Sequence, residues 1–181
     1  MNNTTRIVTS TARLLLSSDS APVWLTQASL LLLRVVLGTV MIHNGLDKMG
    51  DIPGFAEAYV EVIGLPFPIF FAYCAAITEV VASPLLALGF LTRPAALGLF
   101  MTMMVANYHH ILVSGFSIPS IELSSIYAAC FAFFAVYGGG KYAIDTLLVN
   151  ALAEKFLILS DVDSTADSNK VSVLSKQTTI H

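Results

Sequence analysis

Four long, mostly apolar segments constrain the fold of this chain more than any other feature of its sequence. They cover residues 24–42, 66–91, 94–113 and 123–137. A helix needs roughly 20 mostly apolar residues to cross a bilayer, and of these segments only the fourth is clearly shorter. We therefore expect an all-α membrane protein, built as a bundle of four transmembrane helices.

The low content of charged residues supports the same interpretation. Apolar residue types make up 56% of the 181 residues and charged types only 12%, whereas about a quarter of an average soluble domain is charged. So few charges cannot cover a soluble surface, so the lipid bilayer is the expected partner. The net charge of −3 is small and argues against nucleic acid as a partner.

The remaining segments divide the chain around one membrane domain. We expect an N-terminal tail over 1–23, a membrane domain over 24–145, and a polar loop over 43–65 that includes a short interfacial helix from Ala56 to Val62. Apolar residues recur at helical spacing over 146–159, which predicts an amphipathic helix on the membrane surface. Residues 160–181 are rich in Ser, Asp, Lys and Thr and are expected to be disordered.

The distribution of Lys and Arg predicts the orientation of the chain in a cell (cytoplasmic or inner) membrane. With four spans, both tails and the turn at 91–94 lie on one side. That side carries Arg6, Arg13, Arg93, Lys141, Lys155, Lys170 and Lys176. The opposite side carries only Lys48. Because cytoplasmic segments are enriched in Lys and Arg, we expect both termini in the cytoplasm.

Two charged residues lie within the predicted spans, Arg34 in the first and Glu79 in the second. An ionisable group at membrane depth is costly and usually faces a partner or a cavity. Counted from the expected helix ends, the two residues lie at similar depths. We therefore expect them to face each other and form a buried polar centre. This centre either only joins two helices or lines a ligand pocket or proton path.

A second group of polar residues lies near the predicted outer ends of the spans. This outer rim consists of His43, Asn44, Lys48, Asn107, His109, His110 and Glu122. The adjacent residues His109 and His110 point about 100° apart on a helix, so they do not easily share a metal ion, and no metal site is expected. One of these groups could instead form a hydrogen bond to a quinone-type ligand.

The two cysteines, Cys74 and Cys130, are far apart in the sequence and form no recognisable motif. We expect each to pack as a small apolar side chain. An alternative is that they form a dithiol. After the fourth span, the glycines at 138–140 are expected to end the helix. Asp145 is expected to cap the surface helix that follows.

The order of several short motifs resembles the DoxX family of small four-helix membrane proteins, over about residues 28–148. These motifs are Leu33-Arg34 with Gly38, His43-Asn44-Gly45 with Lys48, Gly64-Leu65-Pro66, Glu79, the turn from Leu88 to Ala95, Ala106 with His109, His110 and Gly115, Glu122-Leu123, and Gly139-Gly140-Lys141 with Asp145. This sequence departs from the family at Asn44, where glycine is common, and at its final glycine motif.

The resemblance implies a limited set of functions. The family takes its name from a subunit of a thiosulfate:quinone oxidoreductase. This chain would then be a subunit or accessory of a membrane redox system that handles quinone or small thiol or sulfur compounds. It has no cofactor motif of its own, so catalysis would require quinone or a redox partner subunit, and no catalytic residue can be assigned. The alternatives are a non-catalytic scaffold or assembly factor and a small-molecule transporter.

Overall fold

The computed structural model describes residues 22–156, and all of its regular elements are helices. In chain order they are α2 (Val23–Gly50), α3 (Ile52–Phe55), the π-helix η2 (Ala56–Glu61), α4 (Pro68–Leu88), α5 (Thr92–Ser114), α6 (Ile118–Tyr137) and a last helix over 144–156. The tail expected over 160–181 and most of the tail expected over 1–23 lie outside the described residues.

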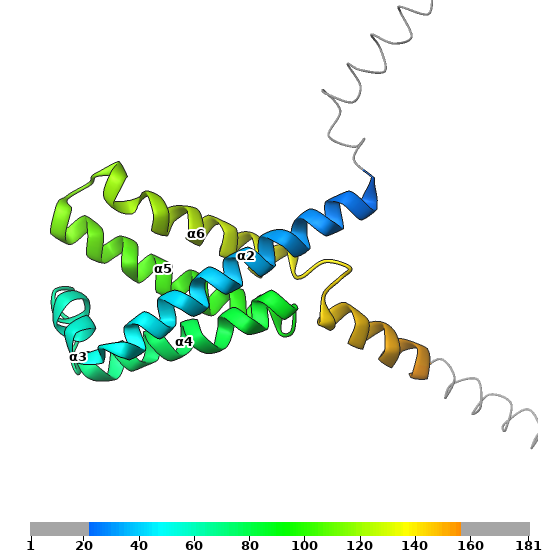
Figure 1. The fold of residues 1–181 in the computed structure, drawn as a ribbon, viewed down its shortest axis with the longest axis horizontal. Helices are drawn as coiled ribbons and strands as arrows, with labels where there is room; N and C mark the ends of the chain where they lie inside the picture. The colour runs from blue at the N-terminus through cyan, green and yellow to red at the C-terminus, as the bar shows by residue number, and fades with distance from the viewer. Residues whose placement is uncertain (1–21, 157–181) are drawn as a thin grey trace, which may run out of the picture.

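The four long helices, α2, α4, α5 and α6, are each long and apolar enough to cross a membrane. The predicted four-helix architecture is therefore confirmed. Figure 1 shows α2 beside α4 and α5 beside α6, with α3 and η2 at one end of the bundle. The helix over 144–156 projects from the opposite end. The side of the membrane on which each end lies stays a prediction.

The first helix is longer than the sequence indicated. We expected a polar loop to begin at residue 43, but α2 continues to Gly50 and contains Lys48 in its last turn. Polar side chains of this segment have partners, since Lys48 pairs with Glu79 and His43 lies 3.4 Å from Asp47. The expected short helix from Ala56 is present as η2, which ends at Glu61.

Small residues let α2 and α4 approach each other closely. A Cβ added to Gly38 would lie 2.7 Å from the Cβ of Ala87, and one added to Gly45 would lie 2.9 Å from the Cβ of Glu79. Glycine at these positions lets two membrane helices pack backbone to backbone. These contacts also fix the antiparallel register, with Gly38 level with Ala87 and Gly45 level with Glu79.

Large apolar side chains fill the centre of the bundle, and all four spanning helices contribute. Met41, Leu86, Leu99, Phe131 and Phe134 belong to one buried cluster and are each completely shielded. The outward faces are also apolar, and many large side chains on them are exposed in the isolated chain. A lipid solvent covers such faces without cost.

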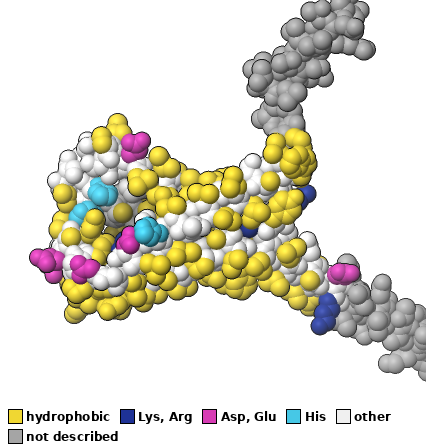
Figure 2. Space-filling view, in the orientation of Figure 1, with side chains coloured by type: hydrophobic (Ala, Val, Ile, Leu, Met, Phe, Trp, Pro, Cys, Tyr) yellow, Lys and Arg dark blue, Asp and Glu magenta, His cyan; other side chains and the backbone are white. Residues whose placement is uncertain are grey.

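The charged residues divide between the two ends of the bundle. Figure 2 shows mainly Asp, Glu and His side chains at the end that carries α3, and Lys and Arg with a small acidic patch at the opposite end. The end that carries α3, where α2 and α5 finish, is called the cavity end because a cavity opens there. The opposite end, where α4 and α6 finish, is called the basic end.

Candidate functional site

A cavity of about 750 Å³ opens at the cavity end of the bundle. Its walls come from the end of α2, from α3 and η2, and from one stripe each of α4 and α5. The α4 stripe is Phe71, Cys74, Ala75 and Thr78. The α5 stripe is Gly98, Met101, Thr102, Val105, Ala106 and His109. These spacings of three and four residues place each set on one face of its helix. Most of the lining is apolar, with a few polar groups.

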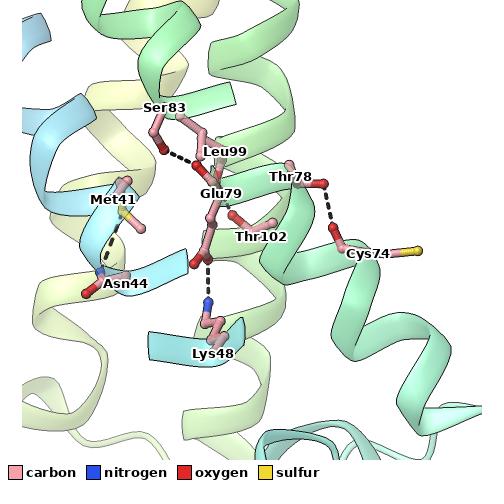
Figure 3. Close-up of polar contacts among 9 residues, drawn as sticks. All are labelled: Met41, Asn44, Lys48, Cys74, Thr78, Glu79, Ser83, Leu99 and Thr102. Carbon is pink, nitrogen blue, oxygen red and sulfur yellow. Dashed lines mark hydrogen bonds and ion pairs between the residues drawn. The ribbon is translucent and has the colours of Figure 1, made fainter. Parts of the chain in front are cut away.

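An ion pair between Lys48 and Glu79 lies at the α2 side of this cavity (Figure 3). Lys48 lines the cavity and donates to Oε1 of Glu79, whose side chain is completely buried. The second carboxylate oxygen, Oε2, is buried and has no hydrogen-bond partner among the described residues. Since a buried carboxylate needs compensation, Lys48 is what allows Glu79 to remain at this depth.

The expected contact between Arg34 and Glu79 is wrong, although both residues are buried as predicted. In the observed register Arg34 lies level with Gly89, about ten residues or ~15 Å along the helix from Glu79. The prediction failed because it ended α2 at residue 42 and so left out Lys48, which lies about four turns beyond Arg34 on the same face of the helix.

Arg34 instead joins three segments at the basic end. Its guanidinium donates to the backbone oxygens of Ala87 (3.1 Å), Tyr142 (3.2 Å) and Gly139. Gly89, at φ 74°, ends α4 and leaves room for this side chain, because a Cβ there would lie 2.5 Å from Nη1. Arg34 therefore fastens the chain after α6 to α2 and α4, which is a structural role.

Asp145 connects the segment after α6 to the start of α5. Its carboxylate accepts hydrogen bonds from the amides of Leu91 (2.8 Å) and Thr92 (2.9 Å) and from the Thr92 hydroxyl (2.8 Å). The residue thus caps the start of α5, and not the following surface helix as expected. Burial alone raises the pKa of Asp145, but the hydrogen bonds from Thr92 and Leu91 and the charge of Arg34 outweigh it. The pKa lies below its ordinary value of 3.8.

His109 is the buried histidine of the cavity. Its Nδ1 lies 3.3 Å from the backbone oxygen of Tyr59 in η2, and the two rings lie 4.4 Å apart between centroids. A carbonyl only accepts, so Nδ1 carries the proton, and Nε2 of a neutral ring is left as an acceptor. His109 therefore holds the π-helical segment against α5, and π-helical turns occur frequently at functional sites.

The predicted outer rim separates into two groups. Asn44, Lys48 and His109 line the cavity. The other rim residues lie elsewhere: His43 is exposed near Asp47, Asn107 accepts from Ser124 and Ser125, His110 touches the edge of His109, and Glu122 is exposed.

The cysteines do not pair, because both are free. Cys74 lines the cavity, and its sulfur points away from the Lys48–Glu79 pair in Figure 3. Cys130 is half-buried and packs beside the central apolar cluster. Among residues 22–156, no group of three metal-ligating side chains lies close enough together to hold an ion.

Sequence reasoning missed several cavity residues, of which Tyr59, Cys74 and Thr78 are the most informative. The stripe on α4 was readable, since Cys74 and Thr78 are four residues apart and share a face with Phe71. The position of Tyr59 was not readable. It depends on a π-helical turn, for which the sequence carries no signal that we recognise.

A bundle of four membrane-spanning helices with a charged pair beside a cavity defines a small integral membrane protein with a pocket between its helices. The DoxX family model matches residues 29–114. The inner membrane protein YphA of Escherichia coli (strain K12) is 32% identical over 124 residues, which cover 64% of this chain and 87% of that protein. The chain therefore belongs to the DoxX family, as its motifs indicated.

A second relative is an uncharacterized membrane protein of Mycobacterium tuberculosis (strain ATCC 25618 / H37Rv). It is 32% identical over 97 residues, half of this chain and 60% of that protein's own length. No solved structure matches the chain. These matches show the family and a membrane location.

Proposed function

We propose that this DoxX-family protein is the quinone-binding membrane subunit or accessory of a redox system. The observation that carries the proposal is the cavity of about 750 Å³ between helices of the bundle, with Lys48 and His109 in its wall. Ligand cavities have volumes of about 300–1,000 Å³, and their walls are mainly apolar with a few placed polar groups. If the protein takes part in catalysis, it does so with a partner subunit that exchanges electrons with the bound quinone.

The polar groups of the wall match the chemistry of a quinone ring. Quinone carbonyls accept hydrogen bonds, and the Lys48 ammonium has three donors, of which Glu79 takes one. A quinol hydroxyl donates, and the free acceptor of a neutral His109 is Nε2. The apolar stripes of α4 and α5 suit the ring and the start of an isoprenoid tail.

The cavity also suits the second ligand class implied by the family. Cys74 lines the wall, so a small thiol or sulfur compound would meet a sulfur atom there. We rank quinone first because the wall is largely apolar and because the Cys74 sulfur points away from the charged pair.

The scaffold alternative has its own supporting observation. Arg34 and Asp145 are each satisfied within the fold and join α2, α4, α5 and the segment after α6. These residues need no ligand. If the protein has a purely structural role, Lys48 and Glu79 likewise serve only to join α2 to α4.

Quinone that co-purifies with the protein tests the proposal. The protein is extracted in mild detergent from membranes that contain quinone, and bound quinone is quantified by chromatography. We expect quinone in the wild type, much less in Lys48→Met at a temperature where that variant is still folded, and wild-type amounts in the control Lys155→Met, which lies outside the cavity. Equal quinone in both variants, or a wild type without quinone, would contradict the proposal.

A further inference from the structure

We propose that a groove at the basic end binds the headgroup of one anionic phospholipid. This basic groove has a volume of about 760 Å³ and lies between the turn from α4 to α5 and the segment after α6. Its main lining residues are Gln27, Arg93, Tyr137, Lys141, Leu148 and Val149. This inference is independent of the proposed quinone site, which lies at the other end of the bundle.

The charges of this groove favour an anionic ligand. Arg93 and Lys141 line the groove, are exposed, and form no ion pair within residues 22–156. The acidic residue of the groove, Asp145, is already engaged by Leu91 and Thr92 and faces the charge of Arg34. Two cations therefore remain available to one phosphodiester.

Exposed aromatic residues near the groove are typical of the depth at which lipid headgroups lie. Trp24, Tyr137 and Tyr142 are all at this end and are 64%, 50% and 50% exposed. Trp and Tyr concentrate at the membrane–water interface, where their rings contact headgroups. These aromatic residues belong to α2, to α6 and to the segment after it, and all three lie at the same end of the bundle as the groove.

The groove also has an apolar wall next to its cations. Phe90 and Leu91 come from the turn after α4, and Leu148 and Val149 come from the last helix. All four are exposed in the isolated chain, and Figure 1 shows the last helix projecting from this end. Acyl chains can cover such a wall, whereas a soluble anion cannot.

The helix N-terminus does not supply the anion site. The amides of Leu91 and Thr92 at the start of α5 already donate to Asp145, so the side chains of Arg93 and Lys141 must hold the phosphate. Basic pockets between membrane helices on the cytoplasmic side recognise anionic lipid headgroups in this way. The predicted cytoplasmic position of this end is consistent with that.

Native mass spectrometry of the detergent-purified protein tests the inference. The protein is titrated with phosphatidylglycerol and, separately, with phosphatidylcholine of the same acyl chains. We expect tighter binding of phosphatidylglycerol. Arg93→Gln and Lys141→Gln should each weaken that binding about five-fold, the effect of about 1 kcal/mol per cation, and leave phosphatidylcholine unchanged.

Lys155→Gln is the matched control, because it removes the same charge from the last helix outside the groove. Its phosphatidylglycerol affinity should equal that of the wild type. An equal loss in this control would mean diffuse attraction and would overturn the proposal, as would equal affinity for the two lipids. Displacement of phosphatidylglycerol by millimolar inorganic phosphate would assign the groove to a soluble anion and would also overturn it.

Discussion

Lys48 and Glu79, 31 residues apart in the sequence, form an ion pair that joins α2 to α4 beside the cavity. The two residues differ in exposure, because the Glu79 side chain is completely buried whereas the Lys48 side chain is 22% exposed on the cavity side. The pair therefore connects the interior of the bundle to the wall where a ligand would bind.

Removal of one partner of this pair should cost more stability than removal of both. Lys48→Met leaves a buried carboxylate without compensation, and loss of one partner of a buried pair costs about 3–5 kcal/mol. We expect the double variant with Glu79→Gln to recover part of that loss. Thermal unfolding in detergent checks the order of the variants. A double variant less stable than Lys48→Met would show that the pair does not act as a unit.

Arg34 should be needed for stability in a way that lysine only partly replaces. Arg34→Met leaves three backbone oxygens without their donor, and we expect a loss of about 4 kcal/mol or more, since hydrogen bonds to charged groups contribute about 1.5–3 kcal/mol each. The stability of Arg34→Lys should lie between those of Arg34→Met and the wild type, because one ammonium cannot reach all three oxygens. Unfolding measurements of the two variants provide the check. Equal stability of both variants with the wild type would contradict the structural role of Arg34.

Asp145 should make stability dependent on pH at acidic values. Its pKa is lowered in the folded chain by the hydrogen bonds and charge that outweigh its burial. The stabilisation is therefore present above the ordinary value of 3.8 and is lost as pH falls through the lower folded value. Asp145→Asn should be less stable near neutral pH, and the unfolding temperatures of variant and wild type should converge as pH falls. Parallel curves would refute this contribution.

Cys74 should report occupancy of the cavity, with Cys130 as an internal control. Cys74 is exposed and lines the cavity, whereas Cys130 is half-buried and is not among its lining residues. A fully substituted benzoquinone, which does not react with thiols by addition, should slow maleimide labelling of Cys74 and leave Cys130 unchanged. Mass spectrometry of labelled peptides measures both rates. Equal protection of the two thiols would indicate a general effect and not cavity binding.

The architecture was readable from the sequence because apolar length is a local property. Four apolar segments correspond to four helices that are long and apolar enough to cross a membrane. The ends of helices were less readable. Residues 43–50 contain several polar side chains and were expected to form part of a loop. They continue α2 instead, and Lys48 forms an ion pair with Glu79 of α4.

The candidate site was only partly readable, because pairing depends on register. Burial of Arg34 and Glu79 followed from their positions in apolar segments, but a shift of about ten residues along α4 decided their partners. The position of Asp145 was also missed, since its capping of α5 joins segments 53 residues apart. Local sequence patterns predict which face of a helix is buried and how deep a residue lies in the membrane. Contacts between segments that are distant in the sequence can be identified only in the packed structure.

The affinity of the protein in nanodiscs for a short-tailed, fully substituted benzoquinone tests the proposed function most directly. Val105→Trp places a large ring in the cavity wall, and Val113→Trp makes the same change on α5 outside the cavity. Both native valines are exposed in the isolated chain. Both variants should unfold at the wild-type temperature. We predict saturable binding in the wild type and in Val113→Trp, and at least ~10-fold weaker binding in Val105→Trp, about 1.4 kcal/mol. Absence of saturable binding, or equal affinity in the two variants, would contradict a quinone site in this cavity.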